Sequence, residues 1–142
     1  MRQIQGLAWL IRAWVAAAAV MLLAACAPEG VFVSMAETGG PEEQFSLGKR
    51  YAGGSFGTRS YERAARWYRK AARQGHQEAQ LRLGDLYETG LGVERDLRQA
   101  RDWYVKAARR SKDRDIHLCL EAERKRTNVE KIYRTEQKAK KR

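Results

Sequence analysis

The sequence predicts an all-α protein, a short α-solenoid of two helix–turn–helix repeats followed by a C-terminal capping helix. The first observation is a repeat, because aligning Phe45–Gly75 with Leu81–Ser111 without a gap gives twelve identities in 31 positions. The second is the helical spacing of apolar residues inside each copy, and the third is a glycine-containing segment between the two helices of each copy. Self-similarity at a fixed period of this size is typical of helical repeat arrays.

The repeat has a period of 36 residues, slightly longer than a tetratricopeptide unit. In the first copy the identical residues are Leu47, Gly48, Tyr51, Gly54, Arg59, Ala64, Trp67, Tyr68, Lys70, Ala71, Ala72 and Arg73. In the second copy the matching structural positions include Leu83, Gly84, Tyr87, Gly90, Ala100, Trp103, Tyr104 and Ala107. Because one repeat cannot bury both faces of its helices, the second copy is expected to stack on the first.

The second helix of each repeat is predicted from an apolar stripe at i, i+3, i+7 and i+10, which lies on one helical face. The stripe consists of Tyr61, Ala64, Tyr68 and Ala71 in the first copy and of Leu97, Ala100, Tyr104 and Ala107 in the second. Ser60 and Asp96 precede these helices at the same repeat position, where a short oxygen side chain accepts a hydrogen bond from a free backbone N–H. Asp96 and Gln99 also have the spacing of a capping box.

The first helix of each repeat contains a glycine, Gly48 or Gly84, among apolar residues. A glycine inside a helix costs about 1 kcal/mol relative to alanine, so its recurrence needs a structural reason. We expect a close approach between helices, in which a large ring such as Trp67 or Trp103 lies against the glycine backbone. The connecting segment GLGVERD, at 90–96, supplies glycines for positive φ and then a helix cap.

Residues 112–142 are predicted to form a charged capping helix and a basic tail. An apolar patch at 116–120 is expected to cover the exposed end of the second repeat. It consists of Ile116, Cys119 and Leu120. A second patch, at 129–133, lies about 220° further round a continuous helix than Ile116, so a break near 127–128 fits the sequence as well as one long helix. The C-terminal segment TEQKAKKR, at 135–142, carries almost no apolar side chain and is expected to be disordered.

The first 25 residues have the features of an export signal. Two arginines are their only charges, and an apolar run extends from Ala13 to Cys26, which is short for a membrane span but has the length of a signal-peptide core. The run ends in LAAC, at Leu23–Cys26, which resembles the lipobox of bacterial lipoproteins. This resemblance implies that Cys26 is acylated and begins the mature protein, anchoring it in the membrane. An ordinary cleaved signal peptide and a short anchor are the alternatives.

The residues after Cys26 indicate which membrane holds the protein and how the folded domain is connected to it. Asp at the position of Ala27 tends to retain enteric lipoproteins in the inner membrane, so the resemblance favours the outer membrane of a bacterial cell envelope, with the protein facing the periplasm. Residues 26–40 contain glycines and no helical period, which predicts a flexible tether. The apolar cluster Val31–Val33 within it is compatible with contact with lipid or with pairing to a partner's sheet edge.

The chain is strongly basic, with a formal net charge of +11 that becomes about +9 when the two arginines of the export signal are removed. Such a charge promotes nonspecific association. Export argues against nucleic acid, and an anionic lipid headgroup, an anionic envelope polymer or an acidic protein is a better candidate. The candidate basic surface consists of Arg66, Arg73, Arg101, Lys138, Lys140 and Lys141. A solvated face that binds nothing is the alternative interpretation.

No residue pattern indicates catalysis. His76 and His117 are isolated, and neither a catalytic triad nor a metal-ligand spacing is present, so we expect no enzyme activity, metal or cofactor. Beyond residue 26 the one cysteine is Cys119, which leaves no pair for an intramolecular disulfide. We expect it to be a small buried hydrophobic residue, and an intermolecular disulfide in an oxidising periplasm is the alternative.

The second repeat resembles the Sel1-like repeat, whose pattern is roughly A-x-x-x-L-G-x-x-Y-x-x-G-x-G-V-x-x-D-x-x-x-A-x-x-W-Y-x-x-A-A. The matching residues are Ala79, Leu83, Gly84, Tyr87, Gly90, Gly92, Val93, Asp96, Ala100, Trp103, Tyr104, Ala107 and Ala108. The resemblance covers Gln44–Ser111 and divides 41–111 into repeats of about 41–76 and 77–111. The first loop departs from the pattern, because it keeps Gly54 but has Ser60 in place of the aspartate.

The two resemblances together imply a lipid-anchored scaffold that acts as a protein–protein interaction adaptor for an unidentified envelope protein. A direct binder of an anionic envelope polymer or of lipid headgroups is the alternative. Salt separates them, because binding to a polyanion falls steeply with ionic strength whereas a protein interface with an apolar anchor does not.

Overall fold

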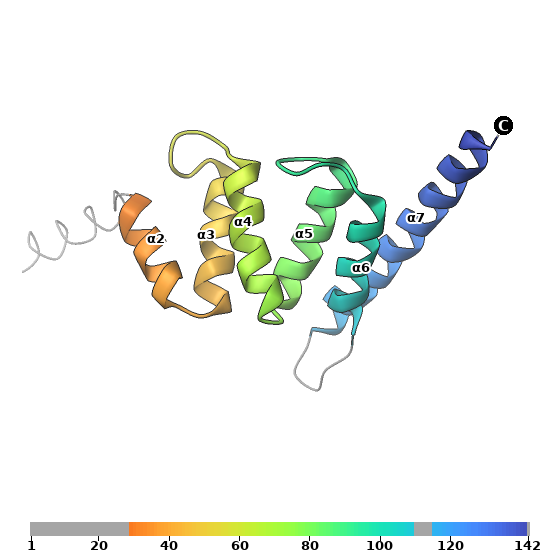
Figure 1. Cartoon of the computed structure of the whole chain (residues 1–142). Coiled ribbons are helices and arrows are strands. Elements are labelled where there is room, and N and C mark those ends of the chain that lie inside the picture. The colour runs from red at the N-terminus through yellow and green to blue at the C-terminus, as the bar shows by residue number, and fades with distance from the viewer. Residues whose placement is uncertain (1–28, 110–114, 142) are drawn as a thin grey trace, which may run out of the picture. The chain divides into compact units, whose positions relative to one another are not determined.

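The computed structural model describes residues 29–109 and 115–141, and in these residues the only regular secondary structure is α-helix (Figure 1). The helices are α2 (Glu29–Thr38), α3 (Pro41–Gly53), α4 (Tyr61–Arg73), α5 (Gln77–Thr89), α6 (Leu97–Ala108) and α7 (Ile116–Lys140). The expected export signal and Cys26 lie outside the described residues. The chain divides into two compact units, Met1–Ser34 and Met35–Arg142, and both repeats lie in the second. Within the described part, no helix is both long and apolar enough to cross a membrane.

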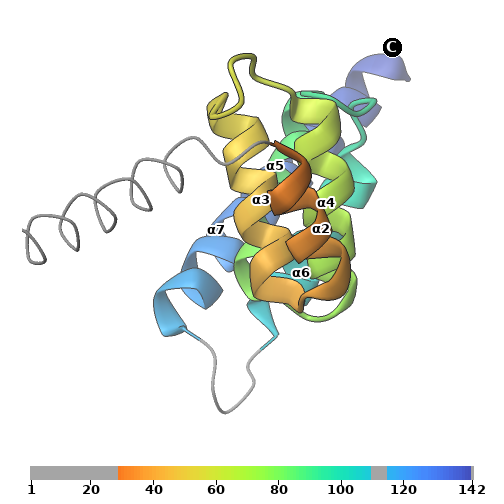
Figure 2. The same ribbon diagram turned by 90° about the vertical axis from the view of Figure 1, so that its left-hand side faces the viewer.

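The second unit is a row of helices in which each one, from α3 onwards, packs against the next (Figures 1 and 2). The first hairpin is α3 and α4, the second is α5 and α6, and α7 packs against α6 with a smaller contact to α5. This arrangement confirms an all-α solenoid of two helix–turn–helix repeats with a C-terminal capping helix. The largest side chains that are fully buried in it are Leu47, Leu81, Leu83, Tyr104 and Val129.

The loops inside the two repeats close in the same way. Gly54 and Gly90 cap α3 and α5 with φ values of 79° and 78°, in the left-handed region that glycine adopts without strain. In the first loop the Ser60 N–H donates to the Tyr51 carbonyl at 3.0 Å, and the equivalent bond in the second loop measures 2.9 Å. The first loop therefore keeps this closing bond although its sequence departs from the Sel1-like pattern.

The predicted helix caps are present. The Ser60 hydroxyl accepts a hydrogen bond from the Arg63 N–H at 3.3 Å. A carboxylate oxygen of Asp96 accepts from the N–H groups of Arg98 and Gln99 at 2.9 and 3.1 Å. The bond from the Gln99 N–H is one half of the expected capping box. In place of the other half, the Gln99 amide donates to the second Asp96 oxygen at 3.1 Å, while the Asp96 N–H donates to the Tyr87 carbonyl.

The helix glycines allow a close approach, as expected. A Cβ atom on Gly48 would lie 2.6 Å from the ring of Tyr68, and one on Gly84 would lie 2.5 Å from the ring of Tyr104. Both distances are too short for real atoms, so each ring occupies the space that a larger residue would need. The same contact joins α3 to α4 in the first repeat and α5 to α6 in the second.

The ring against each glycine is a tyrosine, and the expectation of a tryptophan was wrong. Trp67 and Trp103 each precede that tyrosine by one residue, which turns them about 100° away round the helix. Trp67 is buried and Trp103 is half-buried. Lys70 and Lys106 place their ammonium groups 4.1 and 4.0 Å from the centres of these two rings, within the range of a cation–π contact.

The capping helix α7 is one continuous helix of 25 residues, without a break near 127–128. Its buried residues are Cys119, Ala122 and Val129. Of the patch expected to cover the second repeat, Cys119 is buried as a free thiol, but Ile116 and Leu120 are 54% and 65% exposed. The small Ala122 therefore packs inward where two larger apolar residues were expected to do so.

Two segments expected to be irregular are helical. α7 continues to Lys140, into the segment 135–142 that was expected to be disordered, because lysine, glutamine and alanine favour helix and the docked part of α7 supplies the helix nucleus. The expected tether at 26–40 contains α2, where Glu29 in the first turn complements the helix dipole and Ala36 is buried. Pro41 then starts α3 at a position where its missing N–H costs nothing.

Candidate functional site

Two grooves lie on the second unit. The inter-repeat groove is bounded by α3, the start of α4, and α5 with the loop that follows it, and its residues include Lys49, Arg59, Tyr61, Tyr68, Glu78, Arg82, Asp85, Leu86 and Leu91. The cap groove is bounded by α4, the end of α5, the start of α6 and the last turns of α7, and its residues include Arg69, Tyr87, Glu94, Arg95, Asp96, Arg98, Tyr133, Glu136 and Lys140. Each groove therefore joins residues that are distant in the sequence.

The inter-repeat groove combines an exposed apolar residue with charges of both signs. Leu91, in the loop after α5, is 43% exposed. Arg82 lies 3.3 Å from a carboxylate oxygen of Glu78 and 3.9 Å from one of Asp85. Burial raises the pKa of the Tyr68 hydroxyl to about 12, so this group is neutral at physiological pH. Such a surface can bury an apolar side chain of a partner and pair with charges around it.

A polar cluster beneath this groove connects three helices. The Tyr104 hydroxyl of α6 lies 2.8 Å from a carboxylate oxygen of Asp85 and 2.6 Å from one of Glu88, so its single proton can serve either acid of α5. The Lys125 ammonium of α7 donates to Asp85 at 2.6 Å. Burial, followed by the bond to Glu88, raises the pKa of Tyr104. Asp85 therefore lines the groove and also binds the capping helix.

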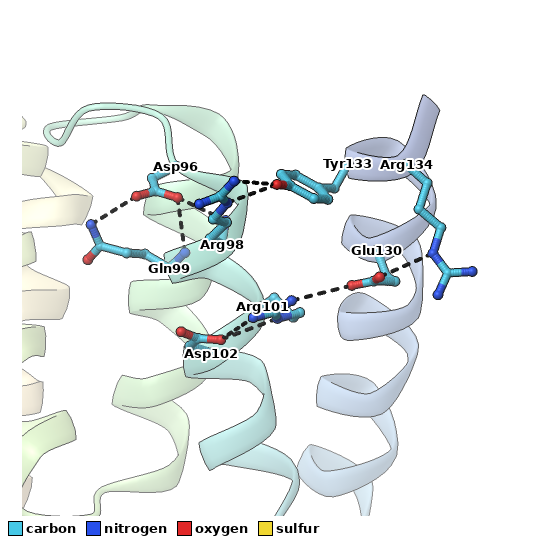
Figure 3. Close-up of polar contacts among 8 residues, drawn as sticks. All are labelled: Asp96, Arg98, Gln99, Arg101, Asp102, Glu130, Tyr133 and Arg134. Carbon is cyan, nitrogen blue, oxygen red and sulfur yellow. Dashed lines mark hydrogen bonds and ion pairs between the residues drawn. The ribbon is translucent and has the colours of Figure 1, made fainter. Parts of the chain in front are cut away.

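The cap groove contains two tyrosine hydroxyls that accept hydrogen bonds from arginines. Arg69 donates to the Tyr87 hydroxyl at 2.9 Å. Arg98 donates through Nε and one terminal nitrogen to the Tyr133 hydroxyl at 2.9 and 2.6 Å (Figure 3). The groove exists only because α7 continues far enough to bring Tyr133 beside α6.

An ion pair fixes the last turns of α7 in the wall of the cap groove. Arg95 places both terminal nitrogens 3.1 Å from one carboxylate oxygen of Glu136 and donates through Nε to the Glu88 carbonyl at 3.0 Å. The side chains of Arg95 and Glu136 are 47% and 41% exposed, so this pair contributes modestly to stability and mainly sets the position of the helix.

The candidate basic surface is not one patch of equivalent cations. Arg66 and Arg73 are exposed on α4, and Lys138, Lys140 and Lys141 are exposed at the end of α7. Arg101 differs, because it lies 3.0 Å from Asp102 and 3.8 Å from Glu130 (Figure 3), and the hydrogen bond that it donates to Asp102 is the main cause of its raised pKa. Its charge is largely compensated within the protein.

The isolated histidine His76 has a structural role. Its Nδ1 accepts a hydrogen bond from the Ala79 N–H at 3.1 Å and caps α5. Since Nδ1 accepts, the neutral ring carries its proton on Nε2, which lies 2.9 Å from a carboxylate oxygen of Glu42. The ring also stacks on Phe45 at 4.4 Å. In the part of the chain that the structure describes, no group of three potential metal ligands occurs.

Cys119 is also part of the packing. The Gln77 amide donates to the Cys119 sulfur at 3.0 Å and to the Ala107 carbonyl at 3.0 Å, which joins α5, α6 and α7 in one buried contact. A thiol held in this way is inaccessible to a partner, which fits the expectation of a small buried residue.

Sequence reasoning missed the polar contacts that join α7 to the second repeat beside the grooves. Asp85 and Lys125 are 40 residues apart, and Arg98 and Tyr133 are 35 apart. Neither pair follows the 36-residue repeat register, because α7 does not repeat the sequence of α5. The prediction of a capping helix was the one signal that pointed to this region.

Comparisons with known proteins agree with the fold. The family model described as Sel1 repeat matches residues 44–76 and 77–112. The chain is thus a helical repeat protein. It contains two Sel1 repeats, and Sel1-repeat proteins generally mediate protein–protein interactions.

Two solved structures are similar to the chain. A Sel1 repeat protein from Oxalobacter formigenes is 35% identical over 56% of this chain and 33% of its own, with a TM-score of 0.53. The antigen c5321, a protective antigen of uropathogenic Escherichia coli with an SLR fold, is 37% identical over 72% of this chain and 21% of its own, with a TM-score of 0.62. The chain thus spans a third or less of each protein's length. No curated protein matches it.

Proposed function

We propose that this chain is a lipid-anchored, periplasm-facing adaptor that binds an envelope protein through the inter-repeat groove. The observation that carries the proposal is the exposed Leu91 among charges of both signs, between the two repeats. An apolar side chain surrounded by polar residues is the usual composition of a protein interface, with the apolar contact supplying affinity and the charges supplying specificity.

The groove fits a partner that supplies one apolar side chain and charges of both signs. Leu91 offers the apolar contact. Lys49 and Arg59 can pair with acidic groups of the partner, while Glu78, whose ion pair with Arg82 lies at the surface, can pair with basic ones. A uniformly charged polymer would meet repulsion from one of these sets wherever it lay.

Binding to envelope protein tests this role. The full chain, immobilised from detergent, is exposed to envelope extract at low and high salt. Leu91→Asp is expected to abolish capture of the partner, whereas Leu120→Asp is expected to leave it unchanged because Leu120 is exposed on α7 outside the groove. Capture that survives Leu91→Asp, or that disappears at high salt in the wild type, contradicts the proposal.

Anchoring through Cys26 is the second part of the proposal, and it is supported by the sequence LAAC at Leu23–Cys26. Two or three acyl chains suffice for stable membrane attachment without a spanning helix. Labelled palmitate should enter the wild-type chain, and Cys26→Ala should abolish incorporation. A wild-type chain that is released in soluble form, or a Cys26→Ala chain that still acquires label, contradicts the anchor. The residue Ala27 supports the outer membrane as the destination.

Direct binding of an anionic polymer or lipid headgroup is the second candidate function. It is favoured by the exposed cations Arg66 and Arg73 on α4 and by the lysines at the end of α7. Each cation near a charged surface contributes about 1 kcal/mol. Removing 138–142 should then weaken low-salt binding to anionic vesicles without changing the melting midpoint, and unchanged vesicle binding would reject this role.

A further inference from the structure

The cap groove contains two tyrosine hydroxyls that accept hydrogen bonds from arginines, whereas the inter-repeat groove contains one, Tyr61 with Arg59. A tyrosine hydroxyl that accepts a hydrogen bond from arginine keeps its own proton for donation. The Tyr87 and Tyr133 hydroxyls both stand in this position, with Arg69 and Arg98 as their donors. Each arginine and tyrosine pair can therefore offer an incoming oxygen atom the tyrosine proton together with remaining guanidinium N–H groups.

Most acidic side chains of the cap groove are engaged within the protein, whereas most of its cations are left without an acidic partner in the described part of the chain. Asp96 is occupied in capping α6, and Glu136 is paired with Arg95. Among the described residues, no carboxylate lies within ion-pair distance of Arg69, Arg98 or Lys140, and these three cations face the single remaining acid, Glu94. The groove thus has an excess of positive charge and of hydrogen-bond donors, which suits a ligand with anionic oxygens.

We propose that the cap groove binds an acidic peptide segment of a partner protein, with its carboxylates on Arg69, Arg98 and Lys140. Arginine supplies two parallel N–H groups that match the geometry of a carboxylate. Glu94, the one acid of the groove that is not engaged by a helix cap or by Arg95, repels a polymer that carries a negative charge on every unit. A peptide places its carboxylates at separate positions and avoids this repulsion.

Fluorescence anisotropy of the full chain in detergent tests this site. The probe is a fluorescein-labelled peptide of alternating glutamate and serine, and the reference probe has glutamine in place of glutamate. Saturable binding is expected for the glutamate peptide alone. The double variant Arg69→Gln with Arg98→Gln should weaken it by about tenfold, which corresponds to about 1.4 kcal/mol.

Matched variants separate the groove from the bulk charge. Arg66→Gln with Arg73→Gln removes the same net charge from exposed positions outside the groove and should leave the affinity nearly unchanged. The single variants Lys140→Gln and Lys141→Gln repeat this comparison, because Lys140 lines the groove and Lys141 does not. Both residues are exposed at the end of α7, so neither change should affect folding. Weakening by Lys140→Gln alone supports the site.

Several outcomes overturn the proposal. Equal weakening by the groove variants and their controls means that bulk charge binds the probe. Inorganic polyphosphate and phosphatidylglycerol vesicles are the competing ligands. If either binds more tightly than the glutamate peptide, displaces it, and loses binding in Lys140→Gln, the groove belongs to a polyanion or a membrane. No binding of the glutamate peptide rejects the site outright. Leu91→Asp should leave peptide binding intact, so failure here is distinguishable from failure of the adaptor role in the inter-repeat groove.

Discussion

At the scale of single residues, each repeat is specified by one glycine and one tyrosine. Gly48 with Tyr68, and Gly84 with Tyr104, place a ring where a side chain would otherwise be. The sequence could predict the close approach, because a glycine inside a helix is costly and recurs at the repeat period. It could not identify the ring, since tryptophan and tyrosine are adjacent in both repeats and only the rotation of the helix decides between them.

Gly84→Ala should destabilise the protein by about 2 kcal/mol, because the new methyl group would overlap the buried Tyr104 ring. The melting midpoint followed by circular dichroism should fall by roughly 10 °C. Gly30→Ala is the control, since a Cβ there meets nothing within 4 Å. An unchanged midpoint for Gly84→Ala would mean that the two helices do not pack through this glycine.

Tyr68 gives a prediction about alkaline pH. Its pKa is about 12 in the folded protein against about 10 in an unfolded chain, so ionisation favours the unfolded state first. The stability that this residue contributes is complete below pH 10 and is lost as the pH rises towards 12, by at most about 3 kcal/mol. Chemical denaturation between these pH values should show a smaller loss of stability for Tyr68→Phe. Equal losses in both proteins would contradict the burial of this hydroxyl.

At the scale of elements, the helices of the repeats could be predicted but the register of α7 could not. The caps at Ser60 and Asp96 and the apolar stripes follow from local spacing. In α7 the large apolar Ile116 was expected to lie on the buried face, but it is exposed. The buried stripe consists of Cys119, Ala122 and Val129, which fall within about 80° of one another round the helix. Since alanine gives a weak apolar signal, the sequence left open a break that the helix does not have.

The stripe on α7 predicts the effect of truncating its side chains. Val129 is fully buried, so Val129→Ala should cost about 2 kcal/mol through lost burial and the cavity that remains. Leu120→Ala removes more atoms from a side chain that is 65% exposed and should cost much less. Urea denaturation of both variants measures this difference. The reverse order would mean that α7 packs through the face of Leu120.

At the scale of the whole molecule, α7 completes an array that is otherwise short. Two repeats are fewer than the three or so that usually give a stable array. α7 covers α6, ties Lys125 to Asp85, and turns a polar face outward, as terminal capping elements do. The sequence indicated a cap but not the cap groove, because the residues of that groove meet only after α7 has docked.

Removal of α7 tests this role. A chain that ends at Arg109 should lose its sharp thermal transition, because Tyr104 and the α6 surface become exposed. A chain that lacks only 138–142 should melt like the wild type, since these residues are exposed where described. Calorimetry of the two truncated chains provides the comparison. A cooperative transition at the wild-type midpoint without α7 would show that two repeats suffice.

The central claim is that a partner protein occupies the inter-repeat groove of the anchored chain, and site-directed photo-crosslinking in intact cells tests it most directly. A photoreactive residue replaces Leu91 in one chain and Leu120 in another, both with Cys26 intact. The account predicts a discrete protein adduct from position 91 and none from position 120. Adducts of the same pattern at both positions, or adducts to lipid or polysaccharide alone, would contradict it.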